Sequence, residues 1–189
     1  MGLQEHLTDL GNTFVASAAA VVLVGWLWVR LGWVSALAYL VCLLAVIGSV
    51  VGLKFIAYDL LPPVDRAPLF GLSEGAPSGH TAFATIVYGS LAVVLIAIDR
   101  RPRAWAAGAF CLAIIAAVAI TRVTLDSHTV GDVVTGLMVA GIGVGVFARA
   151  LTGLIPNRPV SAMAAFFAVV IVTGLLLASG VRFNTLAFL

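Results

Sequence analysis

Two short polar clusters stand in an otherwise apolar sequence, and their residue types together could bind and attack an anion. The tetrapeptide Pro-Ser-Gly-His occupies positions 77–80, directly before a long apolar run. Arg122, His128 and Asp132 follow with the spacing Arg-x5-His-x3-Asp, between two later apolar runs. An ionisable group next to hydrocarbon costs about 3 kcal/mol on insertion scales, so chains rarely keep several of them without a use. The two clusters therefore predict a site of chemistry.

The spacing of His128 and Asp132 suits a nucleophile and the group that orients it. The two residues are four positions apart at the expected start of a helix, so their side chains lie on one face, one turn apart. A carboxylate at that distance accepts the N–H of one imidazole nitrogen and fixes the tautomer. The other nitrogen then keeps a lone pair for attack. We predict His128 as the nucleophile and Asp132 as its partner.

The remaining polar residues suit the binding of a phosphate. Ser78 and Gly79 at a helix start offer backbone N–H groups and the positive end of the helix dipole, and glycine allows close approach to the backbone. His80 follows as an acid or base beside the bound anion. Arg122 supplies a fork of donors that matches phosphate oxygens. Lys54, at the end of the second apolar run, adds a further cation on the same face.

Taken singly, these residues have simpler interpretations. His80 alone could be a helix-end histidine bonded to a neighbouring carbonyl. Arg122 could extend from a helix end towards the lipid headgroups, and Lys54 could end its helix there. Their combination on one membrane face favours a catalytic site.

The elements that must position these residues are predicted to be six membrane-spanning helices. Of the 189 residues, 62% are hydrophobic and 10% charged, and the mean hydropathy is +1.18. A soluble domain is about half apolar and a quarter charged, so this composition is typical of a membrane protein. A spanning helix needs roughly 20 apolar residues, and runs of this kind lie near 12–29, 33–53, 80–98, 104–121, 129–149 and 160–180. We predict an all-α integral membrane protein, a compact bundle of six transmembrane helices in a single domain, residues 1–189.

The basic residues predict the orientation of this bundle. The segment 54–79 contains four prolines and cannot be a spanning helix. With six spans, this segment, the link 122–128 and both termini lie on one membrane face. The opposite face carries six of the ten basic residues, including Arg100, Arg101 and Arg103, and the positive-inside rule places that face in the cytoplasm. We therefore predict a multi-pass protein of a bacterial-type cytoplasmic membrane, with the active site facing the periplasm or exterior.

At the two clusters the chain resembles the type-2 phosphatidic acid phosphatase family. The motifs of that family are Lys-x6-Arg-Pro, Pro-Ser-Gly-His and Ser-Arg-x5-His-x3-Asp. The second motif is intact at 77–80. The third is intact from Arg122 to Asp132, with Thr121 in place of the serine. The predicted six-span layout also agrees with the family, so the resemblance extends over nearly the whole chain.

The first motif departs from the family pattern. Seven residues after Lys54 the chain has Leu61 where the family has arginine, followed by the expected Pro62. The nearest arginine is Arg66. Either Arg66 reaches the phosphate from a rearranged loop, or one phosphate-binding residue is missing.

The resemblance implies metal-independent hydrolysis of a phosphomonoester or diphosphate on a membrane lipid, without a cofactor. His128 would attack phosphorus and form a phosphohistidine, with Asp132 as its orienting carboxylate. His80 would protonate the leaving oxygen and then activate water. The groups expected to hold the phosphate oxygens are Lys54, the Ser78 hydroxyl, the Gly79 amide, Arg122 and, if the loop allows it, Arg66. The lipid could be undecaprenyl diphosphate, a phosphatidylglycerophosphate or phosphatidate-like lipid, or a lipid A phosphate.

Two other functions remain open at this point. The phosphohistidine could pass its group to a lipid or sugar acceptor, which would make the protein a phosphotransferase. Alternatively, the polar cluster could be a binding site only, in a lipid-binding or transport protein. Nucleic acid is not an expected partner, because the net charge is only +2 and no basic stretch is interleaved with aromatic residues. The expected partners are the lipid phosphate substrate and membrane lipids.

Overall fold

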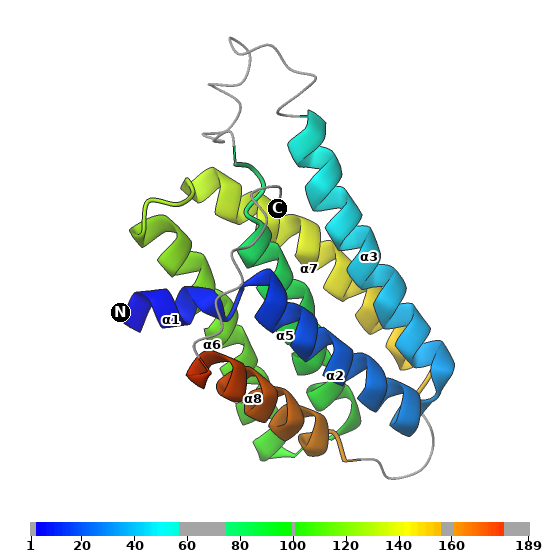
Figure 1. Ribbon diagram of the computed structural model, residues 1–189. Helices are drawn as coiled ribbons and strands as arrows, with labels where there is room; N and C mark the ends of the chain where they lie inside the picture. Colours follow the sequence, from blue (N-terminus) through cyan, green and yellow to red (C-terminus); the bar gives the residue numbers. More distant parts are fainter. Residues whose placement is uncertain (1–2, 57–74, 100, 156–160, 180–189) are drawn as a thin grey trace.

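The computed structural model describes residues 3–56, 75–99, 101–155 and 161–179, and all regular structure in these ranges is helical (Figure 1). This part of the chain forms α1 (Leu3–Asp9), α2 (Thr13–Leu31), α3 (Trp33–Phe55), α5 (Gly79–Ile98), α6 (Pro102–Thr124), α7 (Val130–Thr152) and α8 (Met163–Ala178). The prediction of an all-α protein is confirmed for the described residues.

Local sequence signals explain where several helices begin and end. Asn12 precedes α2, and its side chain accepts a hydrogen bond of 2.9 Å from the amide of Phe14, which satisfies one free donor of the first turn. Gly32 separates α2 from α3 with φ of +98°, a conformation that costs glycine little. Pro102 opens α6, where its missing N–H leaves no unpaired donor.

Five of the described helices are long and apolar enough to cross a membrane, namely α2, α3, α5, α6 and α7. The predicted span 160–180 is represented by α8, which has 16 described residues. A helix of that length rises about 24 Å, less than the ~30 Å hydrocarbon core. A multi-pass bundle is therefore supported, while the count of six spans stays a prediction.

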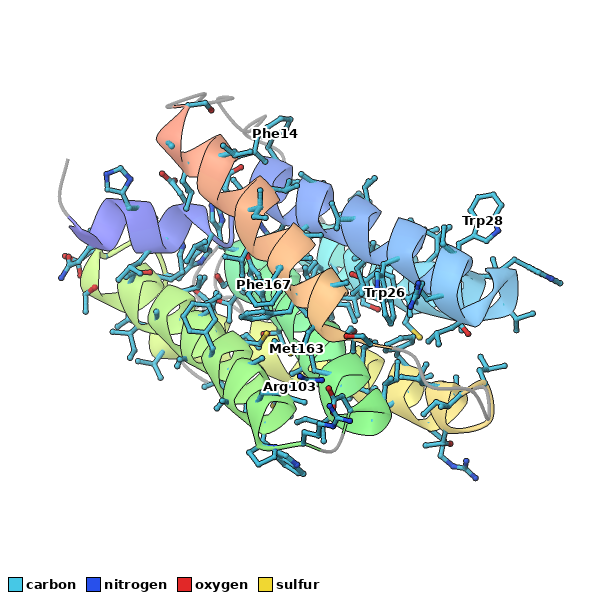
Figure 2. The ribbon with its side chains drawn as sticks, turned by 90° about the horizontal axis from the view of Figure 1, so that it is seen from below. Phe14, Trp26, Trp28, Arg103, Met163 and Phe167 are labelled. Carbon is cyan, nitrogen blue, oxygen red and sulfur yellow. The ribbon has the colours of Figure 1, made fainter. Side chains whose placement is uncertain are left out.

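Helix α5 lies at the centre of the bundle. It packs against α2, α3, α6, α7 and α8, and 15 of its 20 residues are buried. The surrounding helices are buried on one side only, and large apolar side chains cover their outer faces. Figure 2 shows Trp28 pointing outward from α2, whereas Trp26 points toward the neighbouring helices. A protein with apolar residues both inside and outside is suited to a lipid environment.

The antiparallel course of the helices brings four helix ends together. The end of α3, the start of α5, the end of α6 and the start of α7 lie at the upper end of the bundle in Figure 1. Trp28, Trp33 and Trp105 are exposed near the opposite ends of their helices, as is common at a membrane–water interface. The short helix α1 was not predicted. It packs against α6, and its Thr8 contacts Arg122 in the last turn of that helix.

Candidate active site

The two polar clusters are in direct backbone contact. The amide of Ser78, at the start of α5, donates a hydrogen bond of 3.0 Å to the carbonyl oxygen of Asp132 in the first turn of α7. Gly136 follows one turn later, and a Cβ at that position would lie 2.7 Å from the carbonyl oxygen of Ser78. The close approach of the two helices therefore requires a residue without a side chain at 136.

Asp132 is fully buried and holds the start of α7 together. Its Oδ2 accepts a hydrogen bond of 3.0 Å from the amide of Thr129, and its own amide donates one of 3.2 Å to Oγ1 of Thr129. This reciprocal pair is a capping box, and the helix dipole adds to the stability of the carboxylate there. The sequence Thr-x-x-Asp at 129–132 carried this signal, although only the spacing to His128 was used in the prediction.

The same carboxylate oxygen orients His128. The Nδ1 atom of His128 lies 3.4 Å from Oδ2 of Asp132. A carboxylate only accepts, so Nδ1 carries the proton and Nε2 keeps its lone pair. The backbone of the loop contributes as well, because the amide of His128 donates a hydrogen bond of 3.1 Å to the carbonyl oxygen of Arg122.

The surroundings of His128 favour its neutral form. Burial and the positive charge of Arg122 lower the pKa of His128 below its usual value, and Lys54 acts in the same direction. The hydrogen bond and the charge of Asp132 raise this pKa, but they do not outweigh the other effects. A neutral imidazole at pH 7 is the form that can act as a nucleophile.

Arg122 lies in the last turn of α6, and part of its guanidinium has no hydrogen-bond partner among the described residues. Its Nη1 donates a hydrogen bond of 3.4 Å to Oγ1 of Thr8 in α1. Its Nε is buried and has no hydrogen-bond partner among the described residues. A buried donor without a partner is costly, so this atom fits a site that an anionic oxygen fills.

Lys54 and His80 belong to the same electrostatic group as Arg122, His128 and Asp132. The charges of Arg122 and Lys54 act on both histidines, and Lys54 also interacts with Asp132. Lys54 is in the last turn of α3 and His80 in the first turn of α5. The bundle thus gathers residues from α3, α5, α6 and α7 at one end.

The backbone amide of Ser78, one of the donors expected at this helix start, is already occupied, while phosphate binding by the Ser78 hydroxyl stays a prediction. Its amide is taken by Asp132, so this N–H is not free to bind a phosphate. Its hydroxyl oxygen accepts a hydrogen bond of 3.1 Å from Thr81 and caps none of the first-turn amides of α5. The first turn of a helix has no intrahelical acceptors for its amides. The amide of Gly79 is therefore a better candidate for anion binding than that of Ser78.

Arg66 and the loop that contains Leu61 and Pro62 lie outside the described residues, so the role of Arg66 stays a prediction. Within the described ranges, no group of three or more His, Cys, Asp or Glu side chains is arranged to hold a metal ion. Thr8 was missed altogether, because nothing in the sequence near it signals a contact with Arg122.

The effect of Arg122 on the pKa of His128 can be measured without an assay of enzymatic activity. Replacing Arg122 with Gln removes a positive charge that disfavours the imidazolium, so we expect the pKa of His128 to rise. Asp132→Asn removes a negative charge that favours the imidazolium, so we expect the opposite shift. Both shifts can be followed by NMR titration of the His128 imidazole protons, compared with the wild-type titration curve. A downward shift in Arg122→Gln would show that Arg122 does not act on His128 in this way.

Comparison with known proteins places these residues in a family context. The model of the PAP2 superfamily matches residues 35–156, a stretch that includes Lys54 and both polar clusters. No curated protein and no solved structure matches the chain.

Proposed function

The chain belongs to the PAP2 superfamily, and on this premise we propose that it hydrolyses a phosphomonoester or diphosphate on a membrane lipid. The family supports phosphatase activity, and the lipid and the covalent intermediate are our proposal. One observation carries it. Asp132 orients His128 through its carboxylate and binds the Ser78 amide through its backbone, so a single residue joins the nucleophile to the helix start that binds the anion.

In the first step, Nε2 of His128 attacks phosphorus and the bond from phosphorus to the lipid oxygen breaks. His80 donates a proton to that leaving oxygen. A phosphate dianion bound between the histidines attracts the proton to His80 in advance. Asp132 stabilises the positive charge that develops on His128, while Lys54 and Arg122 stabilise the oxygens of the transferring group.

In the second step, water attacks the phosphohistidine. His80, which lost its proton in the first step, now accepts one from this water. The bond between phosphorus and Nε2 of His128 breaks, and inorganic phosphate leaves. No metal takes part in either step, because the positive charges come from Lys54 and Arg122.

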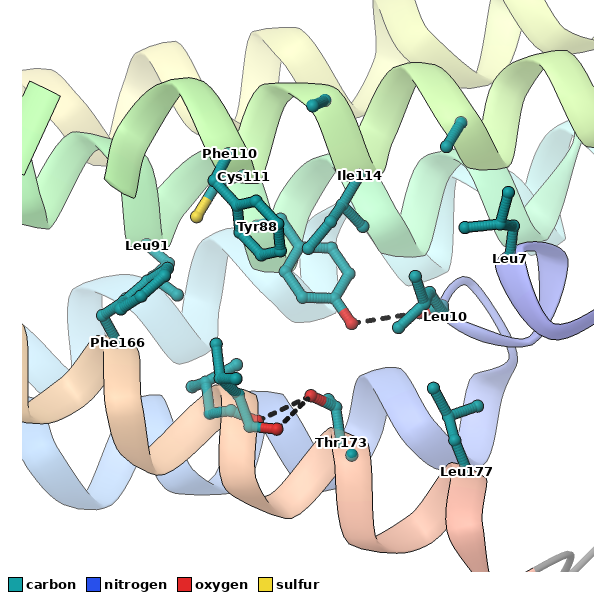
Figure 3. Close-up of a pocket in the computed structure, with 15 residues that line it drawn as sticks. Leu7, Leu10, Tyr88, Leu91, Phe110, Cys111, Ile114, Phe166, Thr173 and Leu177 are labelled. Atoms are coloured by element: carbon teal, nitrogen blue, oxygen red, sulfur yellow. Dashed lines mark hydrogen bonds between the residues drawn. The ribbon is translucent and has the colours of Figure 1, made fainter. Parts of the chain in front are cut away.

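An apolar pocket below the site supports a lipid substrate over a soluble one. It has a volume of about 400 Å³ and lies between α1, α5, α6 and α8 (Figure 3). Its polar side chains are occupied, since the Tyr88 hydroxyl donates to the Leu10 carbonyl and the Thr173 hydroxyl donates to the carbonyl of Val169. Leu7 and Leu10 of the pocket flank Thr8, which contacts Arg122. The pocket therefore suits a hydrocarbon chain whose phosphate occupies the site.

A substrate panel in detergent tests this function. We expect phosphate release from at least one of undecaprenyl diphosphate, phosphatidylglycerophosphate, phosphatidate and lipid A, with undecaprenyl diphosphate as the first candidate. Excess EDTA is expected to leave the rate unchanged, and loss of activity with EDTA would refute the metal-free mechanism. Transfer of phosphate to an acceptor instead of water would identify a phosphotransferase. Binding of these lipids without turnover would identify a lipid-binding protein.

We further propose that the site faces the exterior or periplasm of a bacterial-type cytoplasmic membrane. Exposed Arg101, Arg103 and Arg149 lie at the opposite end of the bundle, which supports a cytoplasmic position for that end. The variant Arg101→Cys tests the orientation, because the native Cys42 and Cys111 are buried and contribute little labelling. We expect labelling only after the membrane is made permeable. Labelling of intact cells by an impermeant reagent would reverse the topology.

A further inference from the structure

The turn at the end of α1, residues 8–11, contacts the candidate site from outside the stretch that matches the family. Thr8 is buried, and its hydroxyl accepts the 3.4 Å hydrogen bond from Nη1 of Arg122. Among the described residues, Thr8 is the hydrogen-bond partner of the Arg122 side chain, whose buried Nε has none. The direction of the guanidinium before substrate binds therefore depends on this hydroxyl.

Gly11 brings the same turn against the backbone of the proposed acid. A Cβ at position 11 would lie 2.7 Å from the carbonyl oxygen of His80 and 2.7 Å from Cγ1 of Val118. Real Cβ atoms do not approach other atoms so closely, and the carbonyl oxygen of His80 cannot move without its helix. The turn can rest against the start of α5 only because residue 11 has no side chain.

A third contact fixes the turn further down α5. The Tyr88 hydroxyl donates a hydrogen bond of 3.2 Å to the carbonyl oxygen of Leu10 (Figure 3). The turn is thus hydrogen-bonded to α6 through Arg122 and to α5 through Tyr88, and Gly11 packs closely against the backbone of His80. These contacts connect the helices that supply the phosphate-binding arginine and the acid.

We propose that the turn 8–11 is a positioning element of the active site, in which Thr8 orients Arg122 and Gly11 sets the start of α5 that carries His80. The kinetic test of this inference rests on the proposed function, because it measures the rate of lipid phosphate hydrolysis. An arginine side chain loses considerable rotamer freedom when it is fixed. A partner that fixes it before the phosphate arrives reduces the cost of binding the substrate.

The test compares Thr8→Val, which keeps the shape but removes the hydroxyl, with Thr8→Ser, which keeps the hydroxyl. We expect kcat/KM of Thr8→Val to fall about fivefold, the worth of one typical hydrogen bond, mainly through KM. Thr8→Ser is expected to retain wild-type kcat/KM. Wild-type kinetics in Thr8→Val, or an equal loss in both variants, would overturn the role of the hydroxyl.

Glycine variants provide the second arm. Gly11→Ala is expected to lower kcat/KM about tenfold, since the methyl group forces the backbone of His80 to shift. Gly25→Ala in α2 is the matched control, because a Cβ there meets no atom within 4 Å. Equal kinetics in the two alanine variants would contradict the role of Gly11.

Two readouts separate positioning from a purely structural role. The first is the acid limb of the pH profile of Thr8→Val. It should shift to higher pH if Arg122 moves away from His128, since Asp132, Lys54 and His80, which also interact electrostatically with this imidazole, are unchanged. The second is the Kd for orthovanadate, a phosphate analogue, which should rise about fivefold.

Loss of activity with a lower Tm but an unchanged acid limb and vanadate Kd would overturn the proposal. If the wild type releases no phosphate from any lipid, the proposed function fails, and the vanadate Kd of the Thr8 variants still decides the positioning role.

Discussion

Replacement of His128 by alanine is expected to reduce kcat by at least about 10⁴-fold, because the nucleophile that forms the covalent intermediate is lost. The fold should survive. The backbone hydrogen bond from the His128 amide to the Arg122 carbonyl does not depend on the side chain. The side chain also lies in the loop between α6 and α7, at the end of the bundle and outside the regular helices. Phosphate release from the preferred lipid measures the loss, and the melting temperature in detergent reports the fold.

His6 provides a matched control for this experiment. It is a histidine on the exposed side of α1 and has no part in the proposed chemistry. His6→Ala should therefore keep wild-type kcat and KM. If His128→Ala instead retained turnover close to that of His6→Ala, another residue would have to be the nucleophile, and the phosphohistidine mechanism would be wrong.

The second large effect concerns His80. We expect His80→Asn to lower kcat for a lipid phosphate by about 10²- to 10⁴-fold, the usual contribution of a general acid or base. A lipid alkoxide leaves poorly without a proton. A p-nitrophenolate leaves without one, so the first step with p-nitrophenyl phosphate should be affected much less.

The second step distinguishes His80 from a residue that only binds substrate. Without His80 no base activates the attacking water, so the phosphohistidine should accumulate in His80→Asn treated with p-nitrophenyl phosphate. Acid-labile phosphate bound to the protein, with a burst of p-nitrophenol, is the expected signature. The double variant His80→Asn/His128→Ala should show neither. Equal losses for the lipid and for p-nitrophenyl phosphate, with no trapped phosphate, would exclude His80 as the acid.

The central part of the site was predictable from local spacing. A separation of four residues puts His128 and Asp132 on one helical face wherever the rest of the chain goes, and their atoms lie 3.4 Å apart. The count of apolar runs also predicted that positions 77–80 and 122–132 share one end of the bundle. The backbone contact between Ser78 and Asp132 agrees with that expectation.

Other features of the structure could not be predicted from residue spacing. The predicted helix ends stopped short of Lys54 and Arg122, which are in the last turns of α3 and α6. Hydropathy falls at the first charge, whereas helical hydrogen bonding continues past it. The use of the Ser78 amide by Asp132 could not be foreseen either, because its partner is far away in the chain.

The sequence by itself determined the residue types, the helical face shared by His128 and Asp132, and the apolar runs long enough to cross a bilayer. These follow from periodicity and from transfer energies, which act over a few residues. The tertiary structure decided which backbone amides remain free to bind an anion. It also decided that α5 and α7 approach closely at Gly136 and that α1 packs so that Thr8 lies beside Arg122. Such contacts join residues far apart in the chain, and they depend on side-chain volumes and hydrogen-bond partners that meet only when the helices pack.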